Sequence, residues 1–194
     1  MVLSLLPLLL LLLSSTSIAA PTNLSPRQCI IEYPSYQGFI QKRNPTVGSN
    51  GPYFLAWKDS STAGAVIDSL IQFSNISSGA WGCQLELFFP KNYAQLLGMN
   101  GGANKLYVYK TTGPIPDGAT WNTAPQAAFL FGNTPTLSVN RLITEDTKIA
   151  INSAGCQPTM SYRVTIAPES GLGGVEFWQD NTYPYAGFRM VHNC

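Results

Sequence analysis

Apolar and polar side chains alternate in short runs over most of the sequence after residue 50. In Cys83–Phe89, and again in 162–166, every second residue is apolar. Successive side chains of a β-strand point to opposite faces, so a period of two indicates strands with one buried face. Further runs expected to form strands are 53–57, 66–74, 106–109, 127–131, 148–151, 175–179 and 188–192.

Turn-forming residues separate these runs. Asn50-Gly51 and Asp117-Gly118 readily adopt the positive φ of hairpin turns, and 171–174 is rich in glycine. Only 92–99 has a helix-like pattern, and it is short. About eight or nine strands joined by turns favour an all-β fold over 51–194, an antiparallel two-sheet β-sandwich or jelly roll stapled by disulfides. The proline-rich, polar residues 20–50 predict an extended leader into this single domain.

A leucine-rich segment begins the sequence, with a run at 3–13 that fades into small residues at 14–20. It has the length of a secretory h-region and is shorter than the roughly 20 apolar residues of a membrane-spanning helix. We expect cleavage after Ala19, which makes 1–19 a signal peptide. The mature chain is then secreted, extracellular or in a cell wall, with no membrane attachment after cleavage.

The four cysteines all follow the predicted signal peptide: Cys29, Cys83, Cys156 and Cys194. An even number in an oxidising compartment predicts two disulfides, for which three pairings are possible. We favour Cys29 with Cys194, which would tie the two ends of the chain together, and Cys83 with Cys156. The residues alone do not decide between the pairings.

Two sequons and one dibasic pair fit the same compartment. Asn23-Leu24-Ser25 and Asn75-Ile76-Ser77 match the acceptor pattern for N-glycosylation, so the mature chain is expected to be a glycoprotein. Lys42-Arg43 is either a solvated pair or the target of a processing protease, and the solvated pair is the simpler interpretation.

Charge and composition exclude several function classes. Eleven Lys and Arg balance ten Asp and Glu, so there is no electrostatic attraction to nucleic acid or an anionic membrane. The single histidine, His192, cannot supply a zinc site of two or three histidines, and a Gly-x-Ser-x-Gly nucleophile pattern is absent. The sequence therefore assigns no catalytic, metal-binding or cofactor-binding residue.

Carboxylates offer the one enzymatic alternative, because glycoside hydrolysis needs only two of them. The candidates are Glu86, Glu176 and Asp180, of which Glu176 lies two residues from Trp178. Alternation places Glu176 and Trp178 on the outer face of a strand, where a carboxylate is normally solvated. A carbohydrate-active enzyme is thus a minor alternative.

Aromatic residues near the end of the sequence form a candidate ligand-binding surface. Trp178, Tyr183 and Tyr185 lie in or beside a polar, proline-containing loop. The flat, apolar faces of such rings stack on other flat groups, including the faces of sugars.

Three blocks resemble the fungal family of But-two C-terminal domains. They are Trp-Gly-Cys-Gln-Leu-Glu-Leu-Phe-Phe-Pro at 81–90, Gly-Cys-Gln-Pro at 155–158, and Val-Glu-Phe-Trp-Gln-Asp at 175–180 with Ala-Gly-Phe-Arg-Met at 186–190. The resemblance covers about 67–194. The family takes its name from a yeast protein that binds the activating enzyme of a ubiquitin-like modifier, a partner that a secreted chain would not meet.

This resemblance implies a β-sandwich in a small secreted fungal protein, often facing the cell wall or a host, with no agreed catalytic residues. It also adds support for pairing Cys83 with Cys156, which lie in matching blocks. The function expected first is a non-catalytic protein of the cell surface or wall whose ligand is polysaccharide. The second is an effector or interaction module that binds an extracellular, host or wall protein, and the carbohydrate-active enzyme is the third.

Overall fold

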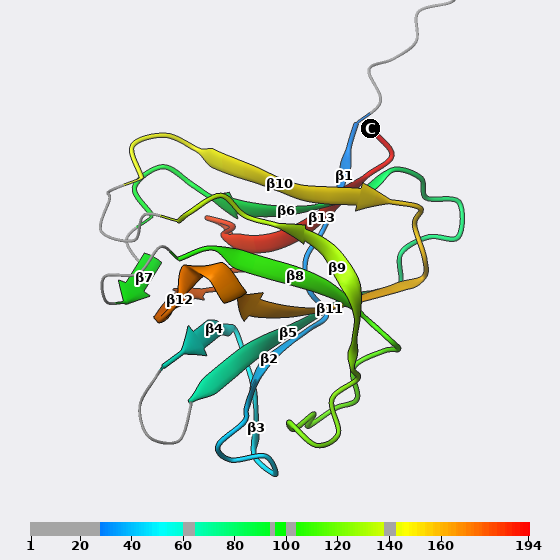
Figure 1. The fold of residues 1–194 in the computed structure, drawn as a ribbon. Coiled ribbons are helices and arrows are strands. Elements are labelled where there is room, and N and C mark those ends of the chain that lie inside the picture. Colours follow the sequence, from blue (N-terminus) through cyan, green and yellow to red (C-terminus); the bar gives the residue numbers. More distant parts are fainter. Residues whose placement is uncertain (1–27, 60–64, 94–95, 100–103, 138–142) are drawn as a thin grey trace, which may run out of the picture.

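The computed structural model describes residues 28–59, 65–93, 96–99, 104–137 and 143–194, with side chains omitted at 96–99. The described chain forms two antiparallel β-sheets that pack face to face as a sandwich (Figure 1). The predicted all-β, two-sheet fold is therefore confirmed. Among the described residues, no helix is both long and apolar enough to cross a membrane.

The smaller sheet contains four strands and the larger sheet nine. In spatial order the smaller sheet is β1 (Ile30–Glu32), β13 (Gly187–His192), β6 (Cys83–Phe89) and β10 (Thr147–Ala154). The larger sheet runs β7 (Leu96–Met99), β12 (Gly173–Trp178), β4 (Tyr53–Lys58), β5 (Val66–Ser74), β11 (Thr159–Ile166), β8 (Leu106–Thr111) and β9 (Ala127–Asn133). In this larger sheet, β2 (Tyr36–Gln41) pairs with β5 and with β3 (Gly48–Asn50), and a short 3₁₀ turn, Pro168–Ser170, precedes β12.

The main core lies between the facing sheets, where the apolar members of the alternating runs meet. Phe54 of β4 stacks on Phe177 of β12 with ring centroids 4.4 Å apart, and Phe188 of β13 approaches them from the other sheet. All three side chains are fully buried. This packing is the physical reason why period-two patterning predicted the strands correctly.

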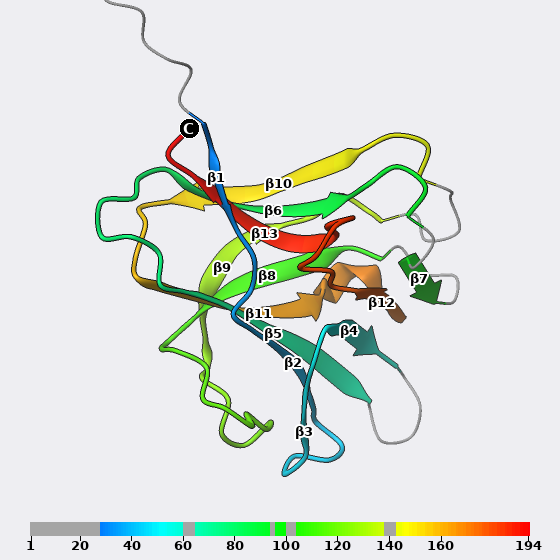
Figure 2. The ribbon, with the colours of Figure 1, turned by 180° about the vertical axis from the view of Figure 1, so that it is seen from behind.

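A second, smaller core covers the outer face of the larger sheet. Leu70 of β5 and Ile40 of β2 pack there against Ile115, Ala119 and Ala124 from the connection between β8 and β9. This connection, residues 112–126, is a long loop that extends below β8 and β9 in Figure 2.

Polar contacts fasten the same connection to the sheet. The Gln72 side-chain oxygen accepts hydrogen bonds from the Ile115 amide at 2.7 Å and from the Ser161 hydroxyl at 2.8 Å. Beside them, the Arg163 guanidinium pairs with the buried Asp68 carboxylate at 2.6 Å, and the Trp121 ring lies over that guanidinium at 4.5 Å.

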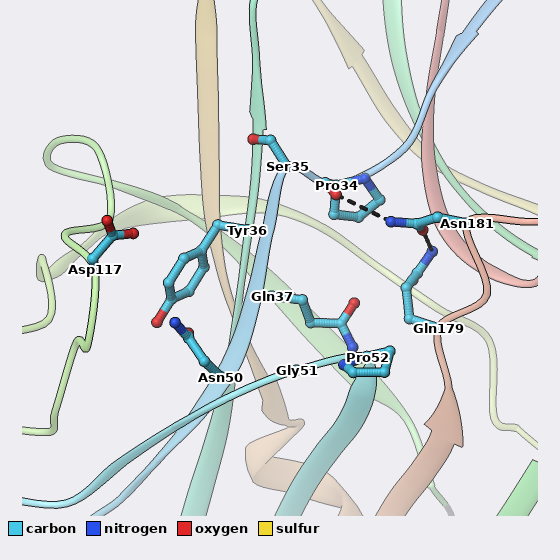
Figure 3. A pocket seen from close by; sticks show the side chains of 10 residues that line it. All are labelled: Pro34, Ser35, Tyr36, Gln37, Asn50, Gly51, Pro52, Asp117, Gln179 and Asn181. Atoms are coloured by element: carbon cyan, nitrogen blue, oxygen red, sulfur yellow. Dashed lines mark hydrogen bonds between the residues drawn. The ribbon is translucent and has the colours of Figure 1, made fainter.

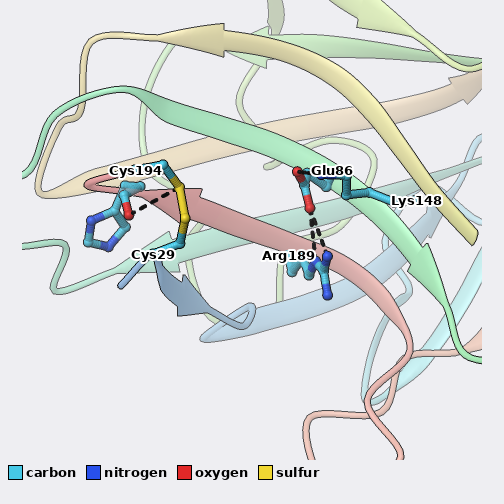
Figure 4. The surroundings of a disulfide bond; sticks show 6 residues. Cys29, Glu86, Lys148, Arg189 and Cys194 are labelled. Atoms are coloured by element: carbon cyan, nitrogen blue, oxygen red, sulfur yellow. Dashed lines mark hydrogen bonds and ion pairs between the residues drawn. A yellow bond between two sulfur atoms is a disulfide. The ribbon is translucent and has the colours of Figure 1, made fainter. Parts of the chain in front are cut away.

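Both favoured disulfides are present. Cys29 is bonded to Cys194, 165 residues away in sequence, and Cys83 to Cys156, 73 residues away. The first disulfide joins the segment just before β1 to the segment just after β13 (Figure 4). The strands β1 and β13 are neighbours in the smaller sheet.

The structure differs from the prediction of an extended leader over 20–50. The described part of this segment forms β1, β2 and β3, and β2 pairs along the whole of its length with β5. Alternation was hidden because Gly38 interrupts it: a Cβ there would collide with the carbonyl oxygen of Ser49 on β3. Residues 20–27 lie outside the described part.

The short helix expected within 92–99 is also absent. Residues 96–99 form β7, which pairs antiparallel with β12 as the last strand of the larger sheet. The hydrogen-bonding edge of β12 selects the extended conformation here, because tertiary pairing overrides a weak local helix preference.

Replacing Asp68 with alanine should destabilise the fold, because it leaves the buried Arg163 guanidinium without its counter-charge. Removing one partner of a buried ion pair costs about 3–5 kcal/mol, and we expect a loss of this order in the free energy of unfolding from urea titration. Glu169→Ala is the matched control, since Glu169 forms an exposed ion pair with Lys105 and should have no measurable effect. Equal losses in the two variants would contradict this role of Asp68.

Candidate functional site

The connection between β12 and β13, residues 179–186, is a closed and ordered loop. Asp180 and Ala186 exchange backbone hydrogen bonds of 2.9 and 3.1 Å at its base. Inside the loop, the Asp180 carboxylate accepts hydrogen bonds from the Thr182 amide at 3.0 Å and the Thr182 hydroxyl at 2.8 Å. Tyr183 nevertheless projects into solvent with 87% of its surface exposed.

Gln179 fixes this loop to the neighbouring strand. Its side-chain oxygen accepts a hydrogen bond from the Phe188 amide at 2.7 Å, and its nitrogen donates to the Phe188 carbonyl at 2.9 Å. The side chain thus provides the two hydrogen bonds that a paired strand would give. Residue 187 must be glycine because its φ is +100° and because a Cβ there would collide with the Gln179 amide.

Three tyrosines line a groove beside the loop. The Tyr33 ring stacks on the Tyr185 ring with centroids 4.6 Å apart, and Tyr183 meets Tyr185 edge-on at 6.4 Å. They border a cavity of about 510 Å³, which we call the tyrosine groove. Its other lining residues are Ile31, Phe88, Pro90, Lys91, Asn92, Asp146, Pro184 and Arg189.

A buried carboxylate holds the cationic wall of the groove in place. The Arg189 guanidinium donates to Glu86 at 3.0 and 2.9 Å and lies 4.1 Å from the centre of the Phe88 ring. Glu86 is 2% exposed and also lies 3.7 Å from the Lys148 ammonium (Figure 4). Glu86, a candidate catalytic residue on sequence grounds, is thus engaged in ion pairs with two cations.

Trp178 lies apart from Tyr183 and Tyr185. Its ring packs against Tyr53 at 5.2 Å, and its carbonyl accepts a hydrogen bond from the Tyr93 hydroxyl at 2.6 Å. The Tyr53 hydroxyl donates a hydrogen bond to Glu176. Glu176 and Trp178 thus both contact Tyr53, and they share the outer face of β12 as predicted. Trp178 is 43% exposed but does not line the tyrosine groove.

The three carboxylates proposed for glycoside hydrolysis are therefore held by different partners. Glu86 pairs with arginine and lysine, Glu176 accepts from a tyrosine, and Asp180 caps its own loop. Within the described residues, no group of three or more His, Cys, Asp or Glu side chains is arranged to hold a metal ion.

Of the two sequons, only the one at Asn75 falls in the described chain. Asn75 is exposed at the end of β5 with a φ of +65°, whereas the middle residue of the sequon, Ile76, is buried. The acceptor side chain is thus accessible. Asn23 lies outside the described residues.

Tyr33 and Arg189 are among the groove residues that sequence reasoning missed. Tyr33 is about 150 residues from Tyr185 in the chain, and only the pairing of β1 with β13 brings their segments together. Arg189 alternates with the buried residues Phe188 and Met190 on β13, but nothing in its spacing indicates that Glu86 lies opposite it on the neighbouring strand β6.

Comparison of the sequence with known protein families and curated proteins found no match: no family model matches the chain, and no curated protein matches its sequence.

Replacing Gln179 with leucine should destabilise the loop and the sheet together, since it leaves the buried Phe188 amide and carbonyl unpaired. Each unsatisfied buried group costs about 1–3 kcal/mol, so we expect a loss of at least about 2 kcal/mol in unfolding free energy from guanidinium titration. Gln84→Leu is the control, because Gln84 makes one exposed hydrogen bond to Ser153. A Gln179→Leu variant as stable as this control would show that the amide contacts do not matter.

Alkaline pH should destabilise the protein through two tyrosines near Trp178. Burial, with a smaller contribution from Glu176, raises the pKa of Tyr53 to about 12, and burial raises the pKa of Tyr93 to about 12. Because both folded-state values exceed the unfolded value of about 10, their stabilising contribution is complete below pH 10 and is lost as pH rises from 10 to 12. Urea titrations across this range should show that decline, and Tyr53→Phe should reduce its slope. A slope unchanged by Tyr53→Phe would contradict the assignment.

Proposed function

We propose that this chain is a secreted, non-catalytic fungal protein of the cell surface or wall that binds polysaccharide in the tyrosine groove. The observation that carries the proposal is the stack of Tyr33 on Tyr185, with Tyr183 exposed beside it. Aromatic faces of this kind offer flat apolar surface to the faces of sugar rings. The closed loop positions Tyr185 against Tyr33 before any ligand arrives, which lowers the entropy lost on binding.

The polar part of the groove suits a neutral polymer. Lys91 and Arg189 contribute positive charge and Asp146 negative charge, and the phenols and Asn92 add hydrogen-bonding groups. Burial and the neighbouring Tyr185 raise the pKa of Tyr33, so its phenol stays protonated and neutral at physiological pH. A mixed set of donors and acceptors around apolar rings is typical of a ligand site that recognises hydroxyl groups.

Features outside the groove support the extracellular part of the proposal. All four cysteines are paired in disulfides, which persist in oxidising compartments. The acceptor residue Asn75 is exposed, and the leucine-rich segment at 3–13 has the composition of a signal peptide. The resemblance to secreted But-two C-terminal domains points the same way.

The test is binding of the secreted, disulfide-intact protein to insoluble chitin, β-glucan and mannan. We expect at least one polymer to retain the wild type, and Tyr185→Ala to weaken that binding about tenfold, which corresponds to the loss of one stacking interaction. Tyr185→Phe keeps the ring and should bind normally.

Trp178→Ala is the matched control, because Trp178 is an exposed aromatic residue at the end of β12 and lies outside the groove. It should bind like the wild type; loss in Trp178→Ala with binding intact in Tyr185→Ala would move the site to the Trp178–Tyr53 surface. No binding of the wild type to any polymer would contradict the proposed function.

A protein partner is the second candidate, and one observation favours it. Phe129 and Leu130 are adjacent, 59% and 43% exposed, and lie on β9 at the end of the larger sheet. An apolar strand at the edge of a sheet is a surface to which another chain can add. If the wild type binds no polymer, this edge becomes the surface to test for binding of host or wall proteins.

A further inference from the structure

A second cavity lies next to the tyrosine groove: its lining includes Pro34, which follows Tyr33 in the chain, and Asn181 of the 179–186 loop. It has a volume of about 380 Å³, and four carboxamide residues line it: Gln37, Asn50, Gln179 and Asn181 (Figure 3). The remaining lining residues are Pro34, Ser35, Tyr36, Gly51, Pro52 and Asp117. We call this cavity the amide pocket. Its volume is within the roughly 300–1,000 Å³ of small-molecule sites.

Gln37 is the unexplained residue of the amide pocket. Its side chain is only 8% exposed, yet neither its amide oxygen nor its amide nitrogen has a hydrogen-bond partner in the described protein. Buried amides are nearly always paired, and an unpaired one destabilises the fold. Figure 3 shows its amide extending from β2 toward the side on which Gln179 and Asn181 lie.

Two other amides of the pocket, those of Gln179 and Asn181, are anchored by hydrogen bonds, in contrast to Gln37. The Gln179 nitrogen also donates to the Asn181 oxygen at 3.2 Å, and the Asn181 nitrogen donates to the Pro34 carbonyl at 3.2 Å. These contacts fix one wall. Gln37 faces that wall with one acceptor and two donors still free, as a group kept for a ligand would be.

The lining selects for a neutral, hydroxyl-rich ligand. Amide groups both donate and accept, as hydroxyl groups do, so the two match in pairs. Asp117 is the one charged side chain among the ten lining residues, and a carboxylate disfavours phosphates and acidic sugars. Burial, with a smaller contribution from Asp117, raises the pKa of Tyr36, so the phenol at the pocket remains a donor at neutral pH.

We propose that the amide pocket is a second binding site, which takes one neutral sugar residue through its hydroxyl groups with Gln37 as the central contact. The choice of a sugar among neutral hydroxyl-rich ligands rests on the proposed function. The pocket and the free Gln37 amide do not rest on it.

The experiment measures binding of glucose, mannose and N-acetylglucosamine to the full secreted chain by calorimetry. We expect one of them to bind, and Gln37→Met to weaken that binding at least tenfold, as expected for losing about 1.4 kcal/mol of hydrogen bonding. Methionine has a similar length and no polar amide, so the melting temperature should stay the same or rise. Gln41→Met is the matched control, since Gln41 is on the same strand but does not line the pocket.

Asn50→Ala provides a second variant that does not alter a buried residue. Asn50 is exposed on β3 and lines the pocket, so this variant should fold normally and weaken monosaccharide binding. Tyr185→Ala should leave monosaccharide binding unchanged because Tyr185 lines only the tyrosine groove of the two cavities.

The outcomes separate the two sites. Polymer binding that requires Tyr185, with no monosaccharide binding by the wild type, would leave the proposed function in place and overturn the amide pocket. Monosaccharide binding lost in Gln37→Met, with no polymer retained, would support the pocket and overturn the groove. A lower melting temperature in Gln37→Met with unchanged binding would show that Gln37 is structural.

Discussion

The side-chain amide of Gln179 is the contact on which the 179–186 loop and its junction with β13 depend. β12 belongs to the larger sheet and β13 to the smaller one, and the chain crosses between them within eight residues. Gln179 stabilises that crossing because it pairs with the backbone of Phe188, which precedes Met190, the first residue of β13 that pairs with β1. The absence of a side chain at Gly187 lets the amide approach the backbone. The position of Gln179 after β12 and the glycine that begins β13 therefore depend on each other.

The outer face of each sheet carries an arginine that lies between a buried carboxylate and an aromatic ring. On the larger sheet, Arg163 lies between the Asp68 carboxylate and the Trp121 ring. On the smaller sheet, Arg189 lies between the Glu86 carboxylate and the Phe88 ring. A guanidinium is planar and weakly hydrated, so it tolerates a carboxylate on its edge and a ring on its face. A lysine at either position would lose the stacking and the paired hydrogen bonds.

Sequence reasoning predicted the strands that line the main core, because alternation survives wherever one face is buried between the sheets. Cys83–Phe89 and Thr159–Ile166 are examples. It failed for β2, where a glycine needed for close strand approach and two glutamines mask the pattern. Of the candidate ligand-binding residues, Tyr183 and Tyr185 share one groove while Trp178 lies outside it. Tyr33 and Gln37 were not predictable, since long-range strand pairing alone brings them to the 179–186 loop.

The disulfide between Cys29 and Cys194 marks one end of the domain, opposite the 179–186 loop. β13 has this bond beyond one end and the 179–186 loop at the other, and six residues of extended strand separate them by about 20 Å. Any segment joined before Cys29 or after Cys194 must leave from the disulfide end. A domain tethered to a surface through either position would present the 179–186 loop and its tyrosines at the end that faces away from that surface.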